Sequence, residues 1–135
     1  MWRSALIDKL HKIGINGPFL QVIKSIYNTT TNSLIYKGSL TSKFMSNIGV
    51  KQGDTLSTIL FNLYINDLPE IFVFHGNDPI TIENTKQSCL KYDDDLIIMS
   101  TSHDGLQKCL HNLSIYCEKW KLDLNTQKTK MVLFN

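Results

Sequence analysis

The sequence lacks the long apolar segments that carry a chain into or across a membrane. No apolar run approaches the roughly 18 residues that a transmembrane helix needs. The N-terminus also lacks the continuous apolar stretch of a secretory leader, and neither internal repeats nor low-complexity tracts are present. We therefore expect an intracellular protein, cytoplasmic or nuclear, without a membrane span.

Cysteine and histidine are both scarce. The three cysteines are Cys89, Cys109 and Cys117, an odd number without a C-x-x-C pair. The four histidines are scattered, and none has a second ligand at the spacing of a zinc site. Because Cys109 and Cys117 fall on the apolar side of an expected helix, we predict buried free thiols in a reducing compartment.

A strong charge of one sign is absent as well. The formal net charge of the 135 residues is +2, which permits contact with nucleic acid but does not argue for it. A hydrophobic content of 42% with 19% charged residues is typical of a globular chain and excludes intrinsic disorder. The length suits one domain with its own core.

The sequence does contain an unusual acidic stretch, Tyr92-Asp93-Asp94-Asp95, followed at once by the apolar residues 96–99. The apolar run is typical of a buried strand, and three adjacent carboxylates repel one another beside it. Such carboxylates offer the hard oxygen ligands that Mg²⁺ or Mn²⁺ prefers. They are equally typical of a solvated hairpin turn, because aspartate is a favoured turn residue.

Hydrophobic periodicity predicts a mixture of helices and short strands. Apolar residues at helical spacing predict helices near residues 1–13, 19–27, 56–68 and 106–120. Strand-like segments occur at 34–36, 44–48, 80–82, 88–90, 96–99 and 131–134. Turn residues at 37–39 and 93–95 predict two hairpins.

A loop punctuated by glycines, residues 49–57, opens the third expected helix, and Asp54 or Thr55 could cap it. Backbone amides, the positive end of a helix and Lys51 would together suit an anionic backbone or nucleotide. An ordinary loop before a capped helix explains the same residues equally well.

Taken in chain order, the predicted helices, the hairpins and the glycine-containing loop resemble the palm of reverse transcriptases, specifically those of non-LTR (LINE-type) retrotransposons. Residues 49–57, GVKQGDTLS, are similar to the family loop G-V-R-Q-G-x-P-L-S-P, and residues 60–68, LFNLYINDL, match the helix after it. Residues 92–96 resemble Y-A-D-D-L, and residues 116–130 resemble Y-C-x-x-W followed by L-N-x-x-K-T-K. Together these motifs are specific, although each alone is weak.

The resemblance implies an α+β fold, a partial polymerase palm in which an antiparallel sheet with an acidic hairpin packs against helices. It also implies RNA-directed DNA polymerisation by two-metal phosphoryl transfer, with Mg²⁺ or Mn²⁺ as cofactor. An RNA template, a DNA primer and dNTP would be the partners.

The resemblance also assigns roles to individual residues. Asp94 and Asp95 match the two catalytic aspartates, with Asp94 as the direct metal ligand and Asp95 in support. Nucleotide and template contacts would come from Lys51, Gln52, Gly53 and Tyr92, and weaker phosphate contacts from Lys128 and Lys130, which are otherwise solvated lysines.

The chain departs from the family pattern at several positions. Asp93 stands in place of alanine and adds a third negative charge. Lys91 replaces an apolar residue of an expected buried strand, and Lys51 replaces an arginine and its bidentate fork. Thr55 and Thr58 replace prolines.

The first catalytic motif of the family, an aspartate-bearing strand, would precede Trp2 and is missing from the sequence. We therefore expect residues 1–135 to form a single partial domain without that motif, the fingers or the thumb. One catalytic carboxylate is then lacking, and we expect no polymerisation by this chain alone.

Other interpretations remain open. The chain could be a catalytically inactive nucleic-acid-binding or interaction module, or a nonfunctional retroelement remnant. A small metal-dependent nuclease or phosphotransferase would need a further carboxylate beside Asp94, for which Asp54, Asp67 and Asp104 are the candidates.

Overall fold

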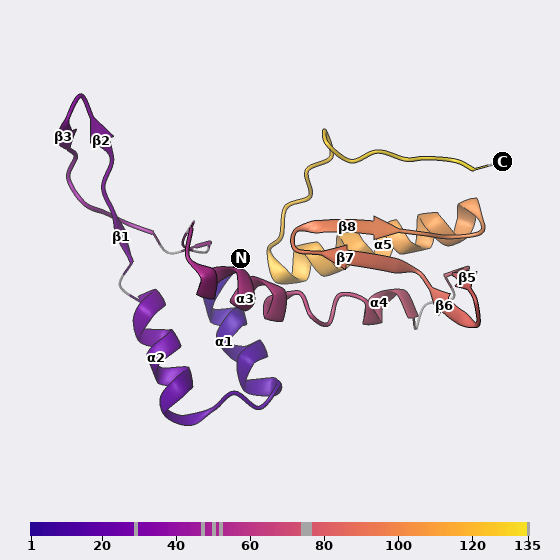
Figure 1. The fold of residues 1–135 in the computed structure, drawn as a ribbon, viewed down its shortest axis with the longest axis horizontal. Coiled ribbons are helices and arrows are strands. Elements are labelled where there is room, and N and C mark those ends of the chain that lie inside the picture. The colour runs from indigo at the N-terminus through magenta and orange to yellow at the C-terminus, as the bar shows by residue number, and fades with distance from the viewer. Residues whose placement is uncertain (29, 47, 50, 52, 74–76, 135) are drawn as a thin grey trace.

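The structure is a computed structural model, and it describes residues 1–28, 30–46, 48–49, 51, 53–73 and 77–134. It has a mixed α+β fold in which helices alternate with short antiparallel hairpins (Figure 1). The elements in chain order are α1 (Arg3–Lys12), α2 (Gly17–Asn28), β1 (Thr31–Asn32), β2 (Ile35–Tyr36), β3 (Ser39–Leu40), β4 (Phe44–Met45), α3 (Thr55–Tyr64), α4 (Glu70–Val73), β5 (Ile80–Ile82), β6 (Thr85–Gln87), β7 (Cys89–Tyr92), β8 (Asp95–Ile98) and α5 (His103–Trp120).

Helices α1 and α2 form a hairpin, and α1 also packs against α3. The hairpin turns at Gly14 and Gly17, whose φ angles of 92° and 66° lie in the left-handed region that favours glycine. Apolar residues of these three helices and of α5 form one core, and the expected buried thiols Cys109 and Cys117 belong to it. The largest fully buried side chains are Tyr64, Phe72, Leu6, Leu10, Ile23, Leu60 and Cys109.

The strands pair antiparallel, as expected, but the described strands form four separate two-stranded sheets and not one continuous sheet. Each strand is two to four residues long, too short to extend a ladder much beyond its own hairpin. In the β7–β8 hairpin, Tyr92 pairs with Asp95, and Cys89 pairs with Ile98. Cys89, Leu96 and Ile98 pack against the core, which gives this hairpin a half-buried face.

Several predicted boundaries need correction. Residues 131–134 form no strand, because an apolar run needs a partner to become one, and these side chains lie exposed beyond α5. Helix α3 ends at Tyr64, earlier than the predicted end at residue 68. Helix α5 begins at His103, because Ser102 caps it by accepting a hydrogen bond from the backbone N–H of Gly105.

No helix in the described ranges is both long and apolar enough to cross a membrane.

Candidate active site

The loop before α3 is held in place by Asp54 and Ser57. Asp54 caps the helix by accepting a hydrogen bond from the backbone N–H of Leu56 at 3.1 Å, and the Ser57 hydroxyl donates to Asp54 at 3.2 Å. The same buried hydroxyl accepts from the backbone N–H of Lys51 at 3.1 Å and lies 2.9 Å from the Tyr27 hydroxyl. Ser57 therefore fixes the loop to both α2 and α3.

The acidic turn joins β7 to β8. Because Tyr92 pairs with Asp95, only Asp93 and Asp94 lie between the two strands. Asp93 has a φ of 52°, a left-handed conformation that aspartate tolerates better than most residues. The three carboxylates are exposed, and they make no hydrogen bond or ion pair with any residue that the structure describes.

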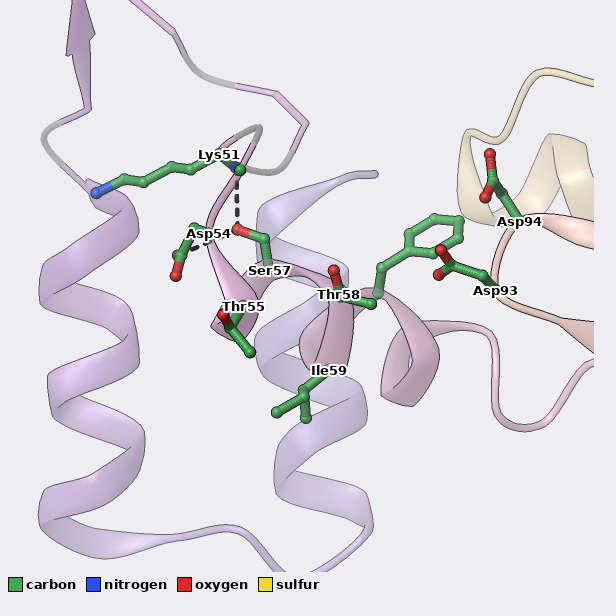
Figure 2. Close-up of a pocket in the computed structure, with 10 residues that line it drawn as sticks. Lys51, Asp54, Thr55, Ser57, Thr58, Ile59, Asp93 and Asp94 are labelled. Carbon is green, nitrogen blue, oxygen red and sulfur yellow. Dashed lines mark hydrogen bonds between the residues drawn. The ribbon is translucent and has the colours of Figure 1, made fainter.

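A single open pocket of about 670 Å³ connects this turn to the loop before α3 (Figure 2). In Figure 2, the Asp93 carboxylate points towards α3, whereas the Lys51 side chain extends away from the acidic turn. The residues that line the pocket are Lys51, Gly53, Asp54, Thr55, Ser57, Thr58, Ile59, Phe61, Asp93 and Asp94. Residues some forty positions apart in sequence therefore meet at one cavity.

The pocket collects some of the predicted site residues and leaves others out. Lys51, Gly53 and Asp94 line it, whereas Asp95 and the exposed Tyr92 do not. Lys128 and Lys130 are exposed in the segment after α5 and also lie outside the lining. Gln52 falls outside the described residues.

The donors at the acidic turn suit a hard cation only in part. Magnesium is commonly held by one or two carboxylates, with water and substrate phosphates as its remaining ligands, and the free carboxylates of Asp93 and Asp94 fit that description. Within the described ranges, however, no three His, Cys, Asp or Glu side chains gather closely enough to form a complete metal site.

The carboxylates considered for a nuclease site are separated. Asp54 shares the pocket but is engaged in capping α3. Asp67 is paired with Lys9, and Asp104 is exposed beside His103. None of the three joins Asp94 in a metal-binding group among the residues described.

A second cluster, around Lys9, was not predicted from the sequence. The Lys9 ammonium donates to the Asp67 carboxylate and the Tyr64 carbonyl oxygen, both at 2.6 Å, and to the Tyr116 hydroxyl at 2.9 Å. It also lies 3.8 Å from the centre of the Trp120 ring. The one local sign of this cluster in the sequence was a lysine among the apolar positions of the first helix. Its partners could not be predicted, because they are 55 to 107 residues away in sequence.

The charges of this cluster perturb one another. Burial lowers the pKa of Lys9, although its hydrogen bond to Asp67 opposes that effect. Burial alone would raise the pKa of Asp67, but the hydrogen bonds from Lys9 and Tyr116 hold that pKa below its usual range. Burial and the neighbouring Asp67 carboxylate raise the pKa of Tyr116. Lys9 and Asp67 form an ion pair at 2.6 Å, the Tyr116 hydroxyl donates to the same carboxylate, and the cluster ties α1 to α5.

The mixed α+β fold agrees with a known family. The sequence profile described as reverse transcriptase (RNA-dependent DNA polymerase) matches residues 1–133. The chain belongs to the reverse transcriptase family.

Within the family, the chain is similar to enzymes of non-LTR retrotransposons, which confirms the resemblance drawn from its motifs. It is 29% identical over 135 residues to the Drosophila melanogaster "Probable RNA-directed DNA polymerase from transposon BS", covering 96% of this chain and 14% of that protein. It is 28% identical to the Pol polyprotein of the element R2DM from Drosophila melanogaster, covering 93% of this chain and 12% of the relative. It is 24% identical to the "RNA-directed DNA polymerase from mobile element jockey" of Drosophila funebris, covering 99% and 15%. The chain thus spans a small part of the length of these relatives.

Proposed function

We propose that this chain supplies part of the nucleotidyl-transfer site of a retrotransposon RNA-directed DNA polymerase, as a partial palm. The single observation that carries the proposal is the pocket that joins the acidic turn to the loop before α3. It combines free carboxylates with backbone amides at a capped helix N-terminus, an arrangement suited to a metal-bound nucleotide.

Each part of the pocket has a proposed role. Asp94, supported by Asp95, would hold Mg²⁺ or Mn²⁺, which when bound would neutralise charge that develops on the transferring phosphate. Lys51 and Gly53 would contact the nucleotide or template, where the absence of a Cβ on Gly53 allows a close approach. Gln52 and Tyr92 would extend that contact, and Lys128 and Lys130 would contact phosphate.

We propose further that this chain does not polymerise alone. No group of three His, Cys, Asp or Glu side chains that could hold a metal forms around Asp94 among the described residues, so the site lacks a complete set of protein ligands. A further carboxylate, the RNA template and the DNA primer would complete the site.

Metal-dependent nucleotide binding tests the proposal. A fluorescent dNTP titrated with the purified chain in Mn²⁺ should bind, and the affinity should fall roughly tenfold or more in Asp94→Asn, as expected for loss of a metal ligand. Asp104→Asn is the matched control, because Asp104 is also exposed but lies outside the pocket. Equal affinities for the two variants would contradict the assigned role of Asp94.

Template-primer extension tests the second part of the proposal. We expect no extension by the isolated chain in Mg²⁺ or Mn²⁺. Robust extension by the wild type that Asp94→Asn abolishes would show that the chain needs no further carboxylate.

A further inference from the structure

Residues 30–46 form a two-stranded ribbon, called the arm below, that projects from the end of α2 (Figure 1). Near its base Asn32 pairs with Phe44, and near its tip Ile35 pairs with Leu40. The tip is a two-residue turn, Lys37-Gly38, in which both φ angles are positive, as in the tight turns that suit a twisted hairpin. The arm is thus a hairpin of two short antiparallel ladders, one at its base and one at its tip.

The arm has almost no contact with the rest of the chain. Every residue of its four short strands is exposed, including large apolar side chains such as Ile35 at 78% and Tyr36 at 67%. An isolated two-stranded hairpin is marginal in water, and soluble proteins rarely expose contiguous apolar surface without a partner. The arm therefore has the character of a binding element.

A single arginine fixes the base of the arm to the body. The Arg3 guanidinium donates to the carbonyl oxygen of Tyr27 at 2.9 Å, in the last turn of α2, just before the chain enters the arm. It also donates to the carbonyl oxygens of Ser46 and, at 3.3 Å, Gly49, on the side that leaves the arm. Because one rigid fork holds both sides, the direction of the arm is set by α1.

The charge around the arm indicates what binds there. No aspartate or glutamate occurs between Asp8 and Asp54, whereas eleven of the twelve acidic residues follow residue 53. The acid-free stretch contains six lysines, Lys9, Lys12, Lys24, Lys37, Lys43 and Lys51. Lys37 and Lys43, in the arm, and Lys51, after it, are exposed, and residues 30–46 contain no acidic residue, so the arm itself is cationic.

We propose that the arm binds single-stranded nucleic acid, with Lys37 and Lys43 contacting phosphates and Tyr36 stacking on a base. A polyanion is the partner that this charge complements, and an exposed aromatic ring beside lysines is suited to unpaired bases. This binding site on the arm is separate from the pocket. The inference rests on the proposed function only for the choice of nucleic acid as the partner. Lys51, at the pocket, follows the arm in sequence and lies on the same basic stretch.

The salt dependence of binding tests the phosphate contacts. Anisotropy of a labelled oligouridine of about 20 nucleotides, titrated with the full chain at several salt concentrations, gives the slope of log affinity against log salt. Each phosphate contact to a single strand contributes about −0.7 to that slope, so Lys37→Gln/Lys43→Gln should make it shallower by roughly 1.4.

A matched double variant, Lys86→Gln/Lys108→Gln, removes the same charge from exposed positions on β6 and α5. Its slope should equal that of the wild type. Equal slopes for the arm variant and this control would overturn the proposal, because the effect would then follow net charge and not position.

Tyr36→Leu tests stacking. Loss of one stacked base should reduce affinity roughly fivefold or more, while the salt slope stays unchanged because no phosphate contact is lost. Circular dichroism of each variant must match the wild type, which is expected because the substituted side chains are exposed. An affinity unchanged in Tyr36→Leu would overturn the stacking contact.

Two further measurements separate the alternatives. Asp94→Asn should bind oligouridine at least as tightly as the wild type, so failure of the polymerase site and failure of the arm give different results. Light scattering reports whether the arm instead joins two copies of the chain. A dimer that Ile35→Ser/Leu40→Ser dissociates, with wild-type affinity for oligouridine, would overturn the proposal in favour of self-association.

Discussion

At the scale of single residues, Lys9 shows how a buried charge is accommodated. Its ammonium is removed from water but gains three oxygen acceptors and lies within 5.0 Å of the centres of the Tyr64, Tyr116 and Trp120 rings. Desolvation of an ammonium costs several kcal/mol, and only good geometry with all protons bonded offsets that cost. Asp67, half exposed, keeps part of its hydration. Replacing Lys9 and replacing Asp67 should therefore change the free energy of unfolding by different amounts.

We predict that Asp67→Ala destabilises the fold more than Lys9→Met. Removing the carboxylate leaves the buried ammonium without its counterion and should cost about 3 kcal/mol. Lys9→Met fills the same space with an apolar chain, while Tyr116 still donates to Asp67, so the loss should be below about 1.5 kcal/mol.

Urea unfolding followed by circular dichroism measures both free energies of unfolding. Asp123→Ala, at an exposed carboxylate, is the control and should change stability by less than about 0.5 kcal/mol. A larger loss for Lys9→Met than for Asp67→Ala would show that the lysine is not held as described.

At the scale of elements, the sequence predicted what depends on near neighbours. Helical spacing located α1, α2, α3 and α5, and the residues around Asp93 and Asp94 indicated a turn between strands. Pairings that need distant parts of the chain were not predictable. Lys9 and Tyr116 are 107 residues apart, and the apolar residues 131–134 could not reveal that they lie without a partner strand.

The same limit applies to the candidate site. Family motifs favoured Lys51, Gly53 and Asp94, which line one pocket. They also favoured Asp95 and Tyr92, which do not line it. Hairpin register explains the difference, because Asp95 pairs with Tyr92 in the ladder, whereas Asp93 and Asp94 occupy the turn. Asp93, which stands where the resembling motif has alanine, is the carboxylate that points towards α3 (Figure 2).

The backbone of the acidic turn leads to a prediction for Asp93. Its φ of 52° is costly for alanine, by about 1–2 kcal/mol, but is tolerated by aspartate and asparagine. Asp93→Ala and Asp93→Asn remove the same charge, so their difference reports the backbone alone. We expect Asp93→Ala to be about 1 kcal/mol less stable than Asp93→Asn in thermal unfolding. An alanine variant at least as stable as the asparagine variant would mean that the turn adopts another conformation.

At the scale of the whole molecule, the chain consists of a packed body with two exposed extensions. The arm lies at one end of the view in Figure 1, and the segment after α5 runs over the other side of the body. The arm contains Lys37 and Lys43, and the C-terminal segment contains Lys130, all of them exposed. Lys9 lies within the body and is 6% exposed.

Limited trypsin digestion should therefore cut the extensions first. We predict early cleavage after Lys37, Lys43 and Lys130, where the backbone has few tertiary contacts, and late cleavage after Lys9. Mass spectrometry of the first fragments identifies the sites. Early cleavage after Lys9 would show that α1 separates from the body under native conditions.

The uneven charge of the chain also has a consequence for the rate at which it meets a partner. The arm and the helices beside it carry the acid-free stretch, whereas eleven of the twelve carboxylates follow residue 53. A molecule with this separation has an electric dipole moment, although its net charge is only +2. In the field of a polyanion it experiences a torque that turns the arm forward before contact. The arm would thus set the orientation of encounter as well as the strength of binding, and that orienting effect would weaken as salt shortens the range of the field.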